Sequence, residues 1–294
     1  MSMPLQTPDM TGIKKNTVQT NLQSARQPQP TVRLARTADE IRRAQILRYK
    51  VFYEEHGATP SEEVRQQKRD FDKFDDTADH VIVLADAPGT PDADKIVGTY
   101  RLLRQDIAES GGGFYSSSEY DLTNLQQTGA SLLELGRSCV LAPYRTKPVL
   151  NLLWQGIADY VAANNIGILF GCASIPGTDI QAIAPWLSYL HHYHPTPENL
   201  RPRALDDRYL PMNLIAKDDL DERAVFASLP PLIKGYLRIG GTVGDGAVLD
   251  KDFNTIDVCI VMPTSHITNR YRKYYERKIQ RPICGGYSEE GADA

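Results

Sequence analysis

The run from Leu132 to Ala173 constrains the fold most, because it contains a strand, a turn, a helix and a second strand in direct succession. Residues 132–141 predict one strand, and residues 166–172 predict a buried strand of the parallel type. Pro148 can begin the helix between them. The apolar positions that share one side of this helix are Val149, Leu152, Leu153, Ile157, Tyr160 and Val161. Such a unit forms a right-handed βαβ crossover, so the chain belongs to the α/β class.

The segment before this unit predicts a strand, a helix and an antiparallel hairpin. Residues 31–35 alternate like a strand, and Thr37 with Glu40 forms a capping box for the next helix. Gly57 is a plausible end for that helix. Its apolar face consists of Ile41, Ala44, Leu47, Val51 and Phe52. Residues 81–85 and 96–103 predict the two hairpin strands, with a turn over residues 87–94.

These elements predict one domain over residues 31–294, built on a mixed sheet. Residues 1–30 are polar and carry almost no large apolar side chains after Leu5, which indicates a disordered tail. Residues 253–262 predict a late strand. Residues 175–245 are rich in proline and histidine, and their pattern assigns no element. No internal repeat is visible.

Composition excludes several classes of protein. The chain of 294 residues has 33 basic and 37 acidic side chains, a net charge of −4, which argues against a nucleic-acid coat protein. No apolar run approaches the ~20 residues that cross a bilayer, and the N-terminus shows no signal-peptide pattern. The four cysteines form no C-x-x-C pair, which favours a reducing cytoplasm over a disulfide framework.

Four short segments carry the chemistry. They are Arg48 with Phe52, Asp72 with Asp75, Arg101 before two leucines, and Glu134 with Arg137 on the strand of the βαβ unit. Together they resemble the acyl-homoserine-lactone synthases, a branch of the GCN5-related N-acyltransferase (GNAT) fold. The resemblance implies a mostly antiparallel central sheet flanked by helices, with a C-terminal extension.

Longer blocks are similar to the bacterial L-ornithine Nα-acyltransferases. These blocks are FYSSSEYDL near 114–122, LSYLHHYHPTPENLRP near 187–202 and PPLIKGYLRIGGTVGDGAVLDKDFNTID near 230–257. The resemblance implies transfer of a 3-hydroxyacyl group from acyl carrier protein to the α-amine of L-ornithine, the first step of ornithine lipid synthesis. It implies no bound cofactor, and the 4′-phosphopantetheine of the carrier protein serves as the donor arm.

Glu134 and Arg137 are the candidate catalytic residues. Amide formation from a thioester needs a neutral amine, a route for its proton and dipoles for the oxyanion. Glu134 can take the proton directly or through water. Strict alternation would point Glu134 and Arg137 to opposite faces, but a β-bulge at Gly136 would turn both toward one cleft and expose backbone N–H groups. The alternative is an ion pair between the two at the sheet edge.

The remaining residues of the motifs are candidates for substrate binding. Arg101 can bind the carboxylate of ornithine, or it can pair with Asp72 or Asp75 in a structural network. Arg48 and Phe52 join this site by resemblance. The acidic run from Asp70 is interrupted by two phenylalanines, so we expect it to pack against the protein. A carboxylate of this run could then bind the side-chain ammonium of ornithine.

The turn after the first βαβ strand bears on the acyl donor. Acetyl-coenzyme A enzymes of the GNAT fold have a glycine-rich turn here, whose N–H groups hold a pyrophosphate. In this chain Pro148 replaces the first glycine and removes a donor. Arg145 and Lys147 remain to meet a phosphopantetheine phosphate. The pattern favours an acyl carrier protein as donor, although an ordinary turn remains an alternative.

Other motifs leave alternatives open. His191, His192 and His194 lack the spacing of a metal site, and Cys139 is more typical of packing than of a nucleophile. The basic segment 270–281 is a solvated helix, or it docks an acidic carrier protein or the anionic inner membrane.

Three rival functions remain open for the whole chain. They are an acyl-homoserine-lactone or other acyl-amino-acid synthase, an acetyl-coenzyme A acetyltransferase, and a non-enzymatic hemolysin-like membrane-interacting protein.

Overall fold

The computed structural model describes residues 29–85 and 89–283. The expected disordered tail, residues 1–30, falls almost entirely outside the described residues, as do the first two residues of the expected turn over residues 87–94. The last eleven residues of the expected domain are also outside them.

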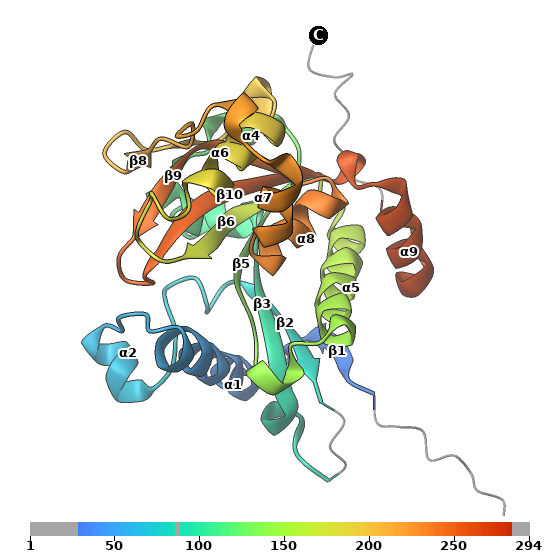
Figure 1. Ribbon diagram of the computed structural model, residues 1–294. Coiled ribbons are helices and arrows are strands. Elements are labelled where there is room, and N and C mark those ends of the chain that lie inside the picture. The colour runs from blue at the N-terminus through green and yellow to red at the C-terminus, as the bar shows by residue number, and fades with distance from the viewer. Residues whose placement is uncertain (1–28, 86–88, 284–294) are drawn as a thin grey trace, which may run out of the picture.

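The central feature is a mixed, mostly antiparallel sheet (Figure 1). Its strands, in spatial order, are β1 (Thr31–Leu34), β2 (Asp79–Leu84), β3 (Ile96–Arg104), β5 (Leu132–Val140), β6 (Ile168–Pro176), β10 (Thr255–Pro263), β9 (Thr242–Asp250), β7 (Arg203–Ala204) and β4 (Tyr120–Asp121), with β8 (Tyr209–Leu210) paired to β9. Only the β5–β6 and β7–β9 pairs are parallel among the pairs described. The predicted βαβ unit, hairpin and sheet type are therefore confirmed.

The helices are α1 (Ala38–Tyr49), α2 (Glu62–Gln67), α3 (Gln105–Ser110), α4 (Thr123–Gln126), α5 (Lys147–Asn164), α6 (Ala184–Tyr193), α7 (Glu222–Ser228), α8 (Pro231–Ile239) and α9 (Asn269–Ile279). The two helices with a predicted start begin at that signal, α1 after Thr37 and α5 beside Pro148. Thr37 caps α1 by accepting the Glu40 N–H at 3.2 Å. The Glu40 carboxylate accepts in return from the Thr37 backbone N–H, which confirms the predicted capping box, and it also accepts from Arg36 N–H and pairs with Arg33. A π-helical turn, Lys50–Glu55, continues α1, and Gly57, with φ +74°, follows it.

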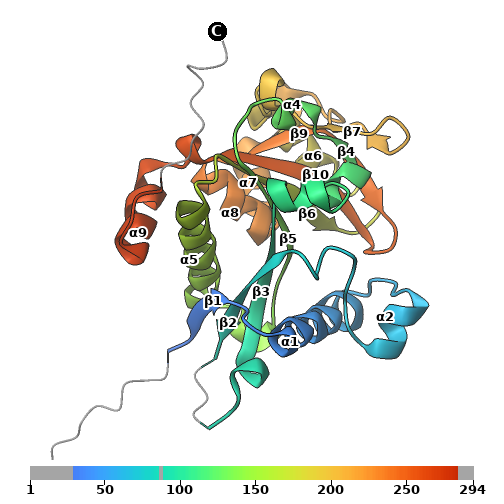
Figure 2. The same ribbon diagram turned by 180° about the vertical axis from the view of Figure 1, so that it is seen from behind.

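Strand β2 shows why the sheet has two covered faces. Val81 and Val83 belong to the large apolar cluster that includes α5, whereas Ile82 and Leu84 belong to the cluster under α1. This alternation is the two-residue period of a strand buried on both sides. Figures 1 and 2 show α1 and α5 on opposite sides of the β1–β3 part of the sheet.

Strands β5 and β6 pair along only part of their length. The parallel register joins residues 132–134 of β5 to residues 168–170 of β6. At the next residue, Gly171, a Cβ atom would lie 2.2 Å from the carbonyl oxygen of Leu135, so only glycine allows this close approach. The strands no longer pair beyond this point, and their side chains are free to line a cavity.

The region without a sequence assignment, residues 175–245, forms α6 to α8, β7, β8 and the beginning of β9. Its elements are mostly short, which hides their periodicity, and α6 and α8 carry proline in the first turn. The predicted late strand begins at Thr255 instead of Phe253, because Asp250 accepts hydrogen bonds from Asp252 N–H and Phe253 N–H and closes a turn there. No helix in the described ranges has the length and apolar character that a membrane crossing requires.

Candidate active site

A cavity of about 280 Å³ lies where β5 and β6 separate. It draws side chains from the turn after α1, from the loop before β4, from α8 and from the β9–β10 turn. The lining residues used below are Phe52, Arg101, Tyr115, Ser116, Glu134, Arg137, Cys172, Asp250, Phe253 and Asp257. Four residues predicted for the site, Phe52, Arg101, Glu134 and Arg137, therefore meet in one place.

Glu134 lies buried at the wall of this cavity. Its carboxylate accepts hydrogen bonds from Tyr115 N–H at 2.8 Å, from Ser116 N–H at 2.7 Å and from Ser116 Oγ at 2.5 Å. Burial raises the pKa of Glu134, and the hydrogen bonds from Ser116 and Tyr115 oppose that rise. A buried carboxylate with a raised pKa, held in one orientation, is suited to accept a proton from a nearby amine. The alternative of a Glu134–Arg137 ion pair is not what the structure shows.

A β-bulge brings both motif residues to the same cavity. Thr99 faces Cys139 and Arg101 faces Gly136, so β5 has one more residue than β3 between these pairs. Arg137 takes the left-handed conformation, φ +52°, beside the predicted Gly136. Neither Arg137 nor Ser138 has a cross-strand partner in this register, and both line the cavity. The expectation of one shared cleft is confirmed.

A buried ion-pair network stands behind the cavity. Arg48 is fully buried and binds both carboxylate oxygens of Asp75, at 2.8 and 2.6 Å. Its Nε also lies 2.7 Å from Asp70. Burial alone would raise the pKa of Asp75, but the hydrogen bonds and charge of Arg48 hold it well below its usual range. The acidic run therefore packs against the protein, as expected.

The same carboxylates hold the two arginines that face the cavity. Arg101 Nη1 lies 2.6 Å from Asp72, and Arg137 lies 3.2 Å from Asp70 and 3.3 Å from Asp72. The guanidinium of Arg137 also lies 4.8 Å from the ring centres of both Tyr115 and Phe253. Arg48, Asp72 and Asp75 thus position Arg101 and Arg137 and do not themselves line the cavity.

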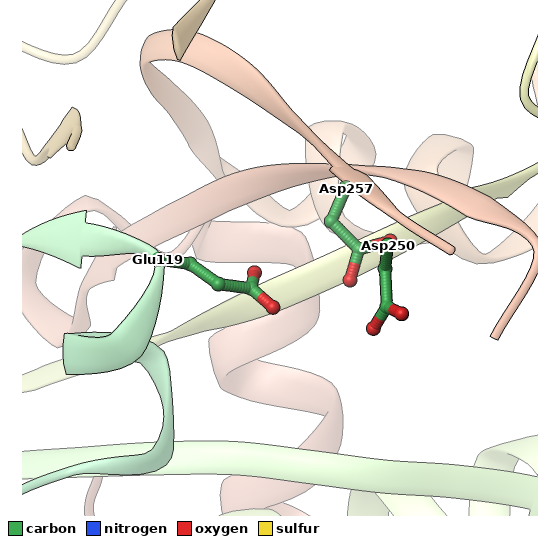
Figure 3. Close-up of side chains that lie close together, drawn as sticks. All are labelled: Glu119, Asp250 and Asp257. Atoms are coloured by element: carbon green, nitrogen blue, oxygen red, sulfur yellow. The ribbon is translucent and has the colours of Figure 1, made fainter. Parts of the chain in front are cut away.

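A second acidic group was not visible in the sequence. The carboxylates of Glu119, Asp250 and Asp257 lie within 4.8 Å of one another, and we call these three residues the acidic cluster (Figure 3). Burial and the charge of Asp257 raise the pKa of Glu119 to about 7, and burial raises the pKa of Asp257 to about 6. Since Glu119 is more than 130 residues from the other two, no local spacing could have predicted this group.

Comparison with known proteins shows which family has this architecture. A family model described as an acetyltransferase (GNAT) domain matches residues 47–155. An L-ornithine N(alpha)-acyltransferase of Rhodobacter capsulatus is 46% identical over 85% of this chain and 95% of its own, and one of Brucella abortus is 44% identical over 85% and 90%. The chain belongs to the L-ornithine Nα-acyltransferase family. Among solved structures, an N-acyl amino acid synthase from uncultured soil microbes shares 12% identity over 82% of this chain and 96% of its own, with a TM-score of 0.46.

In this member of the acyltransferase family, Arg145 and Lys147 lie outside the cavity. Lys147 is exposed at the first turn of α5, with Pro148 beside it. Arg145 donates to the Val140 carbonyl at 3.0 Å and pairs with Glu55. Glu55 adjoins His56, a lining residue, so the turn lies beside the cavity rim.

The histidine motif and Cys139 make other contacts. His192 Nε2 lies 2.9 Å from the Ile215 carbonyl, and His194 Nε2 lies 3.1 Å from the Tyr189 hydroxyl. Within the described part of the chain, the group with metal-ligand geometry is the acidic cluster and includes no histidine. Cys139 is buried away from the cavity, and burial raises the pKa of its thiol.

The network predicts a pH-dependent stability. We expect Asp75→Asn to lower the free energy of unfolding at pH 7 by about 3 kcal/mol, because the buried Arg48 guanidinium then lacks the negative charge of one of its two aspartate partners. The pKa of Asp75 is lower in the folded state than in the unfolded state, where it is about 3.9. The stabilisation by the Asp75 charge is therefore present above about pH 3.9 and is lost as the pH falls toward the pKa of Asp75 in the folded state.

Urea unfolding at pH 7 and pH 3 measures this effect. The difference in the free energy of unfolding between the parent protein and Asp75→Asn should be smaller at pH 3 than at pH 7. The exposed neighbour Asp76 supplies the control, since Asp76→Asn should change stability by no more than about 0.5 kcal/mol at either pH. A difference of equal size at both pH values would contradict the role given to the Asp75 charge.

Proposed function

We propose that the protein transfers a 3-hydroxyacyl group from acyl carrier protein to the α-amine of L-ornithine. The observation that carries this proposal is Glu134, buried at a cavity beside a bulged strand, in a chain that is 46% identical to an L-ornithine N(alpha)-acyltransferase. The cavity offers a carboxylate for the amine proton, backbone N–H groups for the thioester oxygen and arginines for a carboxylate. These are the groups that acylation of an amino acid requires.

The reaction follows from this arrangement. The neutral α-amine attacks the thioester carbonyl carbon, and its proton passes to Glu134 directly or through water. The negative oxygen of the tetrahedral intermediate faces the backbone N–H groups of the bulge at Arg137 and Ser138. The carbon–sulfur bond then breaks, the amide forms, and the thiol of the donor leaves with a proton. No covalent acyl-enzyme is needed.

Arg137 is the residue we assign to the α-carboxylate of the acceptor. Its ion pairs, at 3.2 and 3.3 Å, are longer than the 2.6 Å pair of Arg101 with Asp72. Its guanidinium is fixed between two aromatic rings at the cavity wall. A guanidinium held in this way can bind a carboxylate with little loss of side-chain freedom.

The donor arm approaches from the turn before α5 in this proposal. Lys147 and the first N–H groups of α5 suit a phosphate, and Arg145 extends from the same turn. Pro148 removes one N–H donor, which weakens the turn as a pyrophosphate site. This favours the single phosphate of a phosphopantetheine arm over the pyrophosphate of coenzyme A.

A thiol-release assay tests the reaction. Purified protein should release thiol from 3-hydroxyacyl-acyl carrier protein with ornithine, faster than with acyl-coenzyme A or with S-adenosylmethionine as acceptor. Glu134→Gln should lower kcat about 100-fold, as expected for loss of a general base, whereas the exposed Glu109→Gln should not. Lys147→Ala should raise KM for the carrier-protein donor and leave KM for ornithine unchanged. Full activity in Glu134→Gln would contradict the role of Glu134.

Helix α9 supports a peripheral membrane contact. Arg270, Lys273, Arg277 and Lys278 are exposed on it, and the product of the proposed reaction is an amphiphile. Cosedimentation with vesicles containing phosphatidylglycerol should be stronger than with phosphatidylcholine alone, and Lys273→Glu with Arg277→Glu should reduce it severalfold. Equal sedimentation of parent and variant would exclude α9 as the contact and leave the carrier protein as its candidate partner.

A further inference from the structure

The acidic cluster forms one end of the cavity. Glu119 lies just before β4, Asp250 ends β9, and Asp257 is the third residue of β10. Asp250 and Asp257 line the cavity, and Figure 3 shows the Glu119 carboxylate pointing toward theirs. Three separate parts of the chain therefore bring negative charge to the same end of the cavity.

The cluster has no direct ion pair, although the charge of Arg208 acts on Glu119 and that of Arg137 acts on Asp257. Glu119 is only 2% exposed, yet its Oε2 has no hydrogen-bond partner. Asp70, Asp72 and Asp75, by contrast, each pair with an arginine. In the described part of the chain, no arginine or lysine forms an ion pair with the cluster. Asp250 is half-buried and accepts from Asp252 N–H and Phe253 N–H, and Asp257 accepts from the Thr255 hydroxyl. Burial of the Glu119 and Asp257 carboxylates without a paired cation is costly, and it raises the pKa of both groups.

A short chain of contacts connects the cluster to Glu134. The Ser116 hydroxyl bonds to Glu134 Oε1 at 2.5 Å, and the Cys172 thiol lies 3.3 Å from the same hydroxyl. Cys172 also forms a hydrogen bond with the Glu119 side chain. Glu134 and the cluster are thus separated by two small side chains, a separation suited to the short side chain of a diamino acid.

We propose that Glu119, Asp250 and Asp257 bind the side-chain ammonium of the acceptor and make the enzyme selective for a diamino acid. An ammonium group has three N–H donors, and the cluster offers three carboxylates around one point. The α-amine of the same molecule then faces Glu134. This inference rests on the proposed function and identifies the residues that recognise the acceptor. It also replaces Asp72 and Asp75, whose carboxylates are held by arginines, as the partners of that ammonium.

The test compares ornithine with norleucine, which carries a methyl group in place of the side-chain ammonium. Thiol release from 3-hydroxyacyl-acyl carrier protein gives kcat/KM for each acceptor in the parent protein, Asp257→Asn and Glu119→Gln. The parent should prefer ornithine, and each variant should reduce the ornithine-to-norleucine ratio about 10- to 100-fold, as expected for loss of a charged hydrogen bond. Asp252→Asn, an exposed change of the same charge on the β9–β10 turn, should leave the ratio unchanged.

Several outcomes would overturn the inference. A variant that is folded by circular dichroism and loses activity equally toward both acceptors would give the cluster a structural role only. A preference for ornithine that disappears with EDTA and returns with Mg²⁺ would make the cluster a metal site. If the parent acylates ornithine and the ratio is the same in every variant, the inference alone fails. If the parent acylates another amine and not ornithine, the proposed function fails with it.

Discussion

The buried pairing of Arg48 with Asp75 and Asp70 is the interaction on which the site depends. It joins α1 to the acidic segment that precedes β2, and that segment in turn holds Arg101 and Arg137 at the cavity. Breaking such a pair leaves a buried charge without its partner, which costs more than the loss of a surface contact. The cavity wall is therefore fixed by charges that the substrate need not touch.

The two groups of carboxylates differ in whether arginine side chains are ion-paired to them. Asp70, Asp72 and Asp75 are neutralised by three arginines, so this side of the cavity is complete without a ligand. Glu119, Asp250 and Asp257 are gathered at the cavity without an arginine or lysine ion-paired to them in the described residues. In the function we propose, the first group orients arginines toward the carboxylate of the acceptor, and the second group meets its side-chain ammonium. A diamino acid carries both charges on one short molecule.

Much of the fold could be predicted from the sequence, because its strongest patterns are local. The βαβ unit was visible in the apolar runs around Pro148, and the bulge was visible in the glycine between Glu134 and Arg137. Residues 175–245 gave no assignment, because their short elements leave too few turns or alternations to read. The sequence also left open whether Arg101 pairs with an aspartate; the 2.6 Å distance to Asp72 shows that it does, and its binding of ornithine stays a prediction. The acidic cluster was missed for a similar reason, since it forms only when β4, β9 and β10 come together.

The most direct test of this account is a crystal structure with L-ornithine bound. We predict that the side-chain nitrogen lies within hydrogen-bond distance of Asp257 and Glu119, with the α-amine toward Glu134 and the carboxylate at Arg137. A side-chain nitrogen bound at Asp72 or Asp75, or a metal ion held by Glu119, Asp250 and Asp257, would contradict it.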